Sequence, residues 1–237
     1  MQQIRRLSEP LRLVLAWQSS RKGSSRRRWE VGELRRSSTF PDAEVTFRYF
    51  SDSELSGAKD EGFVGYPAFA LRQGEWSNDV LETFMRRLPP RKRADFPRYL
   101  ETLHIDPNAT FSDFALLGAS EAKLPSDGFS VIDPLDDIDE DREMIIEASG
   151  YRHLADCPAV SAEDPVFFEL DSENPADPHA VAIKSDCELL GWVNRLQTAA
   201  FRHWLAQDRL SAKVNRLNGT PEAPRLYVFV TVSKAIS

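Results

Sequence analysis

A dense run of acidic side chains divides this chain into two regions of ordinary apolar content. Residues 133–147 hold eight acidic side chains and a single base, Arg142. Like charges at this density repel one another and oppose close packing, so the run predicts a linker. We therefore expect two domains, at residues 1–132 and 143–237, joined by an acidic linker at 133–142. A length of 237 residues suits two small domains.

The first region combines short alternating strands with helices. Alternation of apolar and polar residues predicts strands at 11–17, 29–34, 45–49 and 126–132. Helical spacing predicts three helices, two of which begin at the N-caps Asn78 and Thr110, while the third carries Phe96 and Leu103 on one face. The region is therefore expected to form a mixed α/β subdomain with a small antiparallel sheet.

The second region is richer in strands. Candidate strands are 144–149, 166–170, 180–184, 189–193 and 226–232, and one helix fits within 195–206. Short strands with one or two helices predict a small, partly open β-barrel. The whole chain then belongs to the α+β class.

The net charge of −7 conceals a strong segregation of charge. Residues 1–36 hold ten basic and three acidic side chains, a local net charge of +7. Within this stretch the Ser/Gly/Arg-rich segment Ser19–Arg28 is expected to be a basic loop. Its residues Arg26, Arg27 and Arg28 either contact phosphates or form a solvated tip. Because a local basic patch is what nucleic acid recognises, the acidic pI of about 5.2 does not exclude this partner.

Sequence signatures of catalysis and of cofactor binding are missing. There is no phosphate-binding loop, dinucleotide fingerprint, zinc-protease motif or nucleophile elbow. The two cysteines, Cys157 and Cys187, lack CxxC spacing, and the four histidines show no metal-ligand spacing. We expect no cofactor, no metal and no enzymatic activity. A less favoured alternative is a Mg²⁺-dependent nuclease that uses the carboxylates of Asp136–Asp141.

The longest apolar run near the start, Leu13–Trp17, is far shorter than the ~20 residues of a membrane-spanning helix. No apolar segment of the kind found in secretory signals follows the first arginines. The sequence therefore predicts a cytoplasmic protein that does not bind membranes.

The most specific local pattern is Asn174-Pro-Ala-Asp-Pro-His179 followed by alternating Val181 and Ile183. Asn-Pro and Asp-Pro dipeptides favour a compact turn. After a short polar tip, Leu189–Val193 returns as the partner strand of a hairpin. Taken alone, this pattern predicts an ordinary β-hairpin that is preceded by a compact turn.

The pattern of an acidic residue, Asn-Pro-x-Asp-x-x-Ala-Val, a hairpin, Leu-Gly-aromatic-Val and a helix resembles the core of HIRAN domains, over about residues 144–237. This family implies a small barrel, related to OB-type barrels, that binds single-stranded DNA and in characterised members captures its 3′ end. Gly150-Tyr151-Arg152-His153 stands where the family carries Gly-x-basic-aromatic, and Asp177 matches the turn aspartate. Two positions depart from the family: Ala176 and His153 replace an aromatic residue and a tyrosine, which predicts weaker stacking.

The chemistry of the matched residues suits a DNA end. Arg152 can pair with a phosphate, and Tyr151, His153 or Trp192 can offer a ring to a base. Asp177 can accept a hydrogen bond from a terminal hydroxyl and would repel a terminal phosphate. Asn174 and His179 complete the predicted site. Structural alternatives remain open: Asp177 caps its turn, Trp192 belongs to the core, and Arg152 pairs with the acidic linker.

Residues 11–132 resemble the N-terminal subdomain of HipA-type toxin kinases. The resemblance rests on Trp29–Leu34, Val45–Phe50, Val80–Pro89 and Phe111–Gly118. In that family the subdomain packs on the kinase core and contacts antitoxin partners, and in some systems it is a separate antitoxin. The family's Gly-rich turn after the last helix is replaced by Ala119–Lys123, and the kinase core is absent from this chain.

Two functional hypotheses follow from these resemblances. In the first, the chain is a non-enzymatic two-domain adaptor: its HIRAN-like domain binds single-stranded DNA or DNA 3′ ends, and its N-terminal domain binds a protein partner such as a HipA-like kinase or a repair or defence enzyme. In the second, it is an antitoxin-like regulator of a HipA-type kinase.

Overall fold

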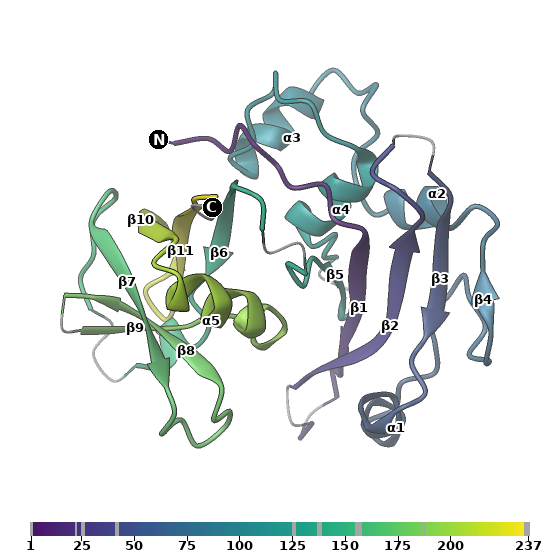
Figure 1. Cartoon of the computed structure of the whole chain (residues 1–237). Coiled ribbons are helices and arrows are strands. Elements are labelled where there is room, and N and C mark those ends of the chain that lie inside the picture. Colours follow the sequence, from purple (N-terminus) through teal and green to yellow (C-terminus); the bar gives the residue numbers. More distant parts are fainter. Residues whose placement is uncertain are drawn as a thin grey trace. The chain divides into compact units, whose positions relative to one another are not determined.

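The computed structural model describes residues 2–21, 23–24, 27–40, 43–124, 127–136, 139–154, 158–186 and 188–234. These residues form two compact units (Figure 1). The N-terminal unit comprises Glu9–Leu103 and Thr110–Asp136, and the C-terminal unit comprises Met1–Ser8, His104–Ala109 and Asp137–Ser237. None of the helices described is long and apolar enough to cross a membrane.

The N-terminal unit contains a five-stranded antiparallel sheet in the order β4–β3–β2–β1–β5. The strands are β1 (Arg12–Gln18), β2 (Arg28–Arg36), β3 (Val45–Tyr49), β4 (Glu75–Trp76) and β5 (Phe129–Ile132). The helices are α1 (Ser53–Asp60), α2 (Val80–Met85), α3 (Phe96–Thr102) and α4 (Asp113–Ser120). The expected mixed subdomain with a small antiparallel sheet is what forms.

The core of this unit is strongly aromatic. Phe47 of β3 is fully buried, and its ring lies 4.9–5.8 Å from the rings of Tyr49, Phe69, Trp76 and Phe84. Burying each such side chain stabilises the fold by roughly 1.5–3 kcal/mol. The apolar residues whose alternation predicted a strand at 45–49 therefore also form part of this core.

Both predicted helix caps in this unit lie one or two residues from the actual ones. Helix α4 begins after Ser112, whose Oγ accepts a hydrogen bond from the Ala115 amide at 3.0 Å, so Thr110 is not the cap. Helix α2 begins after Asp79, which has a left-handed φ of 55° and makes no side-chain cap bond. The prediction of Asn78 as a cap is therefore also wrong.

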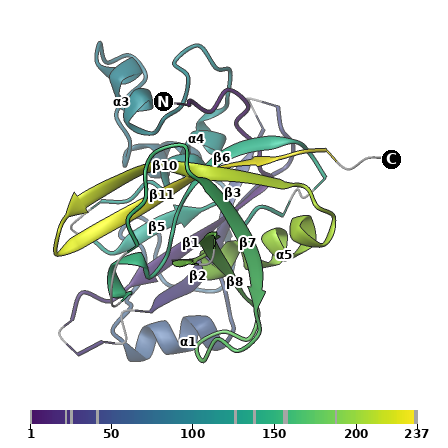
Figure 2. The ribbon, with the colours of Figure 1, turned by 90° about the vertical axis from the view of Figure 1, so that its left-hand side faces the viewer.

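The C-terminal unit contains a six-stranded antiparallel sheet in the order β6–β11–β10–β7–β8–β9 (Figure 2). Its strands are β6 (Arg142–Glu147), β7 (Pro165–Asp171), β8 (Ala180–Ser185), β9 (Glu188–Trp192), β10 (Leu210–Thr220) and β11 (Ala223–Val232). Helix α5 (Thr198–Ala206) packs on β7 and β8, with the Phe201 ring 5.0 Å from that of Phe168. Two 3₁₀ turns, η1 (Tyr151–His153) and η2 (Arg195–Gln197), complete the unit.

The edges of this sheet are bridged at a single residue pair. Ser149, just after β6, exchanges backbone hydrogen bonds of 2.8 and 2.9 Å with Trp192 at the end of β9. The sequence predicted a small, partly open barrel; the described residues form an antiparallel sheet whose two edge strands meet at this pair.

Two segments that the sequence analysis placed in its first domain belong to the C-terminal unit. Ile4 pairs with Ile105 as a parallel bridge, with backbone bonds of 2.6 Å to His104 and 2.9 Å from Asp106. Ile4 and Ile105 are 4% and 0% exposed. We call residues 2–8 and 104–109 together the strap.

The acidic run is partly neutralised by arginines of the basic N-terminal stretch. In the N-terminal unit, Asp136 accepts from Arg12 Nε and Nη2 at 2.6 and 3.1 Å. In the C-terminal unit, Asp141 pairs with Arg6, and Glu143 accepts from the Arg5 amide at 2.8 Å. These contacts reduce the repulsion between carboxylates that are close in the sequence. The assignment of 133–142 as a linker stays a prediction.

Candidate nucleic-acid interface

The turn between β7 and β8 is held by two of its own side chains. Asn174 Oδ1 accepts from the amides of Ala176 and Asp177 at 3.0 and 3.2 Å. Asp177 Oδ1 accepts from the His179 amide at 2.8 Å. Asx side chains that bond to amides two residues ahead fix such turns. The alternative in which Asp177 caps its turn is therefore realised, through one of its two carboxylate oxygens.

Asp171, at the end of β7, ties this turn to Trp192 on β9. Its Oδ2 accepts from Trp192 Nε1 at 2.8 Å and from Asn174 Nδ2 at 3.2 Å. The hydrogen bond from Trp192, followed by that from Asn174, lowers the pKa of the Asp171 carboxyl below its ordinary value. Because both donors favour the ionised form, the carboxylate is a stable anchor for the indole.

Two glycines let η1 approach Trp192 from the other side. Gly150 has a φ of +86°, and a Cβ there would lie 3.0 Å from Trp192 Cζ3. Gly191 has a φ of +129°, and a Cβ there would lie 2.6 Å from the Ser149 carbonyl oxygen. The positive φ disfavours a side chain at both positions, and at Gly191 the close carbonyl oxygen excludes one by space as well. The Gly-x-basic pattern and the Leu-Gly-aromatic pattern thus meet at the Ser149–Trp192 pair.

Of the predicted ring donors in η1, Tyr151 is unavailable. It is 2% exposed, and its hydroxyl donates to the Pro158 carbonyl at 2.6 Å. A base cannot stack on a ring that the core already covers, so this residue has a structural role and its prediction as a contact is corrected. Arg152 and His153 are exposed, and Arg152 Nε donates to His153 Nε2 at 3.1 Å.

The remaining predicted residues lie on two segments connected with Trp192: the turn that Asp171 ties to the indole, and η1 beside β9. Trp192 is half-buried, neither in the core nor fully solvated, and it adjoins both the turn and η1. His179 is exposed on the turn, and Asp177 is half-buried. We call Arg152, His153, Asp171, Asn174, Asp177 and Trp192 the Trp192 cluster. Sequence reasoning missed Asp171, although a carboxylate at a strand end three residues before Asn174 was a usable signal.

The predicted phosphate contacts on the basic loop are engaged within the N-terminal unit. Arg27 pairs with Glu54, and its guanidinium lies 4.2 Å from the Trp29 ring centroid. Arg28 Nη1 lies 3.7 Å from a carboxylate oxygen of Glu121. Arg26 lies outside the described residues, as do Cys157 and Cys187. Since Arg27 and Arg28 face carboxylates, much of their charge is compensated internally.

The carboxylates suggested for a nuclease are divided between the two units, and two of those that are described pair with arginines. Asp136 and Asp141 face different arginines, Arg12 and Arg6, and Asp137 lies outside the described residues. In the part of the chain that the structure describes, no group of three His, Cys, Asp or Glu side chains is placed to hold a metal ion.

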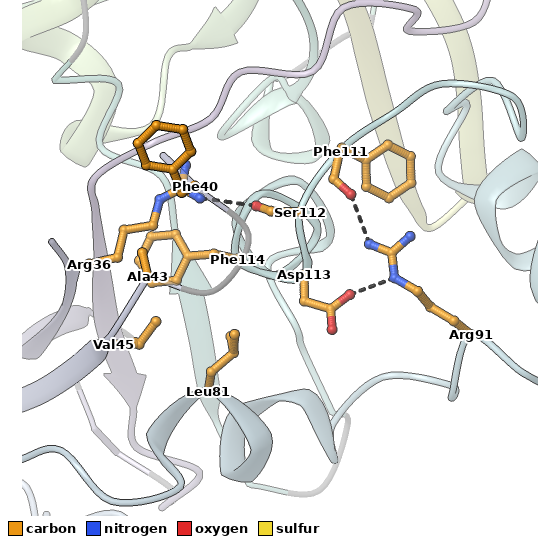
Figure 3. A pocket seen from close by; sticks show the side chains of 10 residues that line it. All are labelled: Arg36, Phe40, Ala43, Val45, Leu81, Arg91, Phe111, Ser112, Asp113 and Phe114. Atoms are coloured by element: carbon orange, nitrogen blue, oxygen red, sulfur yellow. Dashed lines mark hydrogen bonds and ion pairs between the residues drawn. The ribbon is translucent and has the colours of Figure 1, made fainter. Parts of the chain in front are cut away.

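The N-terminal unit has a separate small pocket, with a volume of about 270 Å³ (Figure 3). Its apolar lining includes Phe40, Val45, Leu81 and Phe114. Phe40 is 75% exposed, which is unusual for a phenylalanine. Arg36, Arg91, Ser112 and Asp113 also line the pocket, so an exposed aromatic ring lies beside a hollow of mixed apolar and charged character.

Comparison with known proteins gave one partial match. No family model matches the sequence, and no curated protein matches it significantly. Among solved structures, the HIRAN domain of human HLTF matches over 38% of this chain and 74% of that chain, at 16% sequence identity and a TM-score of 0.32.

Proposed function

We propose that the C-terminal unit binds the free 3′ end of single-stranded DNA and that the chain is a non-enzymatic adaptor. The observation that carries this proposal is the Trp192 cluster: Asp171 ties the indole to the aspartate-containing turn, and η1, which carries the exposed Arg152, lies beside β9. The sequence pattern of HIRAN domains runs through the same residues. The proposed role is binding without catalysis, and binding requires no proton donor, nucleophile or metal.

Each member of the cluster has a distinct role in the proposed complex. Arg152 is exposed, has no ion pair with a carboxylate among the described residues, and can offer its guanidinium to a phosphate. The exposed part of Trp192 and the ring of His153 offer surfaces for a base, each worth ~1–3 kcal/mol. Asp177 Oδ1 is occupied by the His179 amide, and Oδ2 has no partner among the described residues. That oxygen can accept from a terminal sugar hydroxyl.

Binding of a fluorescent single strand, followed by anisotropy over a series of salt concentrations, tests this proposal. Arg152→Ala should weaken binding and reduce the salt slope by about 0.7, the value for one phosphate contact on a single strand. Arg98→Ala, which removes an exposed arginine of α3 in the N-terminal unit, is the matched control and should change neither quantity. If the two variants bind alike, the Trp192 cluster is not the site.

We also propose that the N-terminal unit binds a protein, with a HipA-type kinase as the partner implied by the sequence resemblance. The exposed Phe40 at the rim of a pocket with both apolar and charged lining supports this assignment (Figure 3). Phe40→Ser should abolish co-purification with such a kinase from the native host, whereas Phe167→Ser, at a 54% exposed phenylalanine of β7, should not. Inhibition of the kinase by the chain would favour the antitoxin-like alternative over an adaptor.

A further inference from the structure

The β10–β11 hairpin carries a second candidate for binding a phosphate, an arginine that lies outside the Trp192 cluster. Arg216 lies in register with Tyr227, just after the bulge in β10, and its guanidinium carbon is 4.3 Å from the Tyr227 ring centroid. Stacking on the ring holds the guanidinium plane in place. The side-chain oxygen of Asn215 accepts from its Nη1 at 2.9 Å, and the amide of Asn218, once turned to satisfy its own hydrogen bonds, places its oxygen 3.0 Å from Nε. The second terminal nitrogen, Nη2, has no partner among the described residues.

The charge of Arg216 is not compensated within the described part of the chain. No carboxylate there lies within ion-pair distance of it, although it is half-buried. Burial lowers the pKa of this guanidinium more than the neighbouring Tyr227 raises it, and the nearby Arg225 lowers it further. Holding a cation partly out of water without a counter-charge costs free energy, which an external anion would recover.

Unlike Arg216, the neighbouring cations Arg225 and Lys213 are paired with carboxylates. Arg225 also approaches the Tyr227 ring, at 5.7 Å, but it forms a two-pronged ion pair with Glu147 on β6, with oxygens at 2.9 and 2.5 Å. Lys213, three residues before Arg216 on the same strand, pairs with Glu163. Arg216 is therefore the cation of this hairpin that retains its charge for a ligand.

Strand register connects this position with the Trp192 cluster. Tyr227 pairs with Glu147, and Leu226 accepts from the Ala148 amide at 2.9 Å. Gly150 follows Glu147 by three residues, which corresponds to roughly 10 Å along an extended chain. Figure 2 shows the β10–β11 hairpin that carries Arg216. Single-strand sites on small barrels cover about 4–16 nucleotides, so a strand held at its end continues over neighbouring surface.

We propose that Arg216, stacked on Tyr227, binds a backbone phosphate of single-stranded DNA several nucleotides away from the end held at the Trp192 cluster. This inference rests on the proposed DNA-end function and adds to it a direction for the strand, from the segment that follows β6 along β11 to the Arg216–Tyr227 pair. A phosphate accepts both from Nη2 and from the free edge of Nη1. A flat guanidinium supported by a ring suits this geometry better than a lysine.

The test compares two strand lengths with a common 3′ end, a thymidine dinucleotide and an oligothymidylate of about 8 nucleotides. Arg216→Gln should weaken binding of the longer strand about tenfold at low salt and reduce its salt slope by about 0.7, while leaving the dinucleotide unaffected. Arg216→Lys should restore the slope and only part of the affinity. Lys213→Gln, which removes a compensated cation from the same strand, should behave as wild type with both ligands.

Three other outcomes are decisive. Equal loss of both ligands in Arg216→Gln would show general damage to the unit and overturn the inference, as would equal binding of the longer strand by wild type and Arg216→Gln. The proposed end-binding function would survive the second result. Failure of the wild-type chain to bind either strand would overturn both, and an Arg216-dependent interaction with polyglutamate in its place would identify an acidic peptide as the ligand.

Discussion

At the scale of single residues, the position of Trp192 depends on one carboxylate. Asp171 Oδ2 accepts hydrogen bonds from the Trp192 indole N–H and from the Asn174 side-chain amide, so one atom joins β7, β9 and the turn. Spacing within the sequence could place Asn174 and Asp177 in one turn, because such bonds are local. It could not show that Asp171 meets a tryptophan 21 residues later.

Replacing Asp171 by alanine should release the indole of Trp192 and weaken binding of single strands. The indole N–H resonance of Trp192 in a ¹H–¹⁵N spectrum should move toward the position of a solvated indole. In the wild type the pKa of Asp171 is lowered, so the contact should persist as pH falls to 3.8 and disappear only below that value. An indole resonance that is unchanged in the variant would contradict the assignment.

Glu33 of β2 is buried, only 2% exposed, and lies between arginines of three strands. Its oxygens accept from Arg35 Nε at 2.9 Å and Arg48 Nε at 2.6 Å, and Arg12 Nη1 lies 3.5 Å away. Burial alone would raise the pKa of this carboxyl, but the two hydrogen-bonded arginines outweigh burial and lower it.

Glu33→Gln should therefore lower the free energy of unfolding of the N-terminal unit by about 1–3 kcal/mol at neutral pH, since it leaves three arginines facing a neutral amide. The contribution of Glu33 is present above pH 4.5 and is lost as pH falls through the lowered pKa. Urea unfolding at neutral and acidic pH measures this difference, and a difference that does not shrink in acid would contradict the account.

At the scale of elements, the sequence predicted the strands with clear alternation and missed those without it. The strands expected at 11–17, 45–49 and 180–184 match β1, β3 and β8 within a residue. Strand β10 was missed because a bulge between Val214 and Arg216 shifts its alternation. Helix α1 was missed because it has little apolar character; its start is set by Asp52, whose carboxylate accepts from the amides of Glu54 and Leu55.

The single pair that bridges β6 and β9 makes Gly191 a sensitive position. Gly191→Ala combines a strained positive φ with a Cβ that would overlap the Ser149 carbonyl oxygen. It should lower the stability of the C-terminal unit by about 1–3 kcal/mol and weaken binding of single strands. Gly23→Ala, where the φ is also positive but the space is open, separates the effect of conformation from that of the lost pair.

At the scale of the whole molecule, the division of the chain into units does not follow the order of the sequence. Residues 104–109 lie between α3 and α4 of the N-terminal unit, yet they belong to the C-terminal unit. This division could not be predicted from the sequence, because Ile4 and Ile105 are isolated apolar residues without periodicity and lie about one hundred positions apart.

Ile105→Ala should therefore destabilise the C-terminal unit by about 2–5 kcal/mol, the range for removing a buried isoleucine side chain. Leu100→Ala, five residues earlier in α3, should destabilise the N-terminal unit by a similar amount. Amide hydrogen exchange distinguishes them: the first should lower protection in β6, β10 and β11, and the second in β1–β3. The reverse pattern would contradict the division.

The strap also makes the C-terminal unit sensitive to pH through His104. Burial, and next the charge of Arg216, lower the pKa of this imidazole below 6.5. The unfolded chain then binds a proton more readily than the folded one, so stability falls as pH drops below 6.5. His104→Asn, which tolerates the left-handed φ of 57°, should flatten this part of the pH–stability curve. A curve of unchanged slope would show that His104 is not the group responsible.

The central claim is that the Trp192 cluster holds a 3′-terminal sugar hydroxyl near the carboxylate of Asp177. Anisotropy measurements with one single strand carrying either a 3′-hydroxyl or a 3′-phosphate test this most directly. We predict that the 3′-hydroxyl strand binds at least about tenfold more tightly, since a phosphate dianion beside Asp177 is repelled. Equal affinity for the two strands, or tighter binding of the 3′-phosphate, would contradict it.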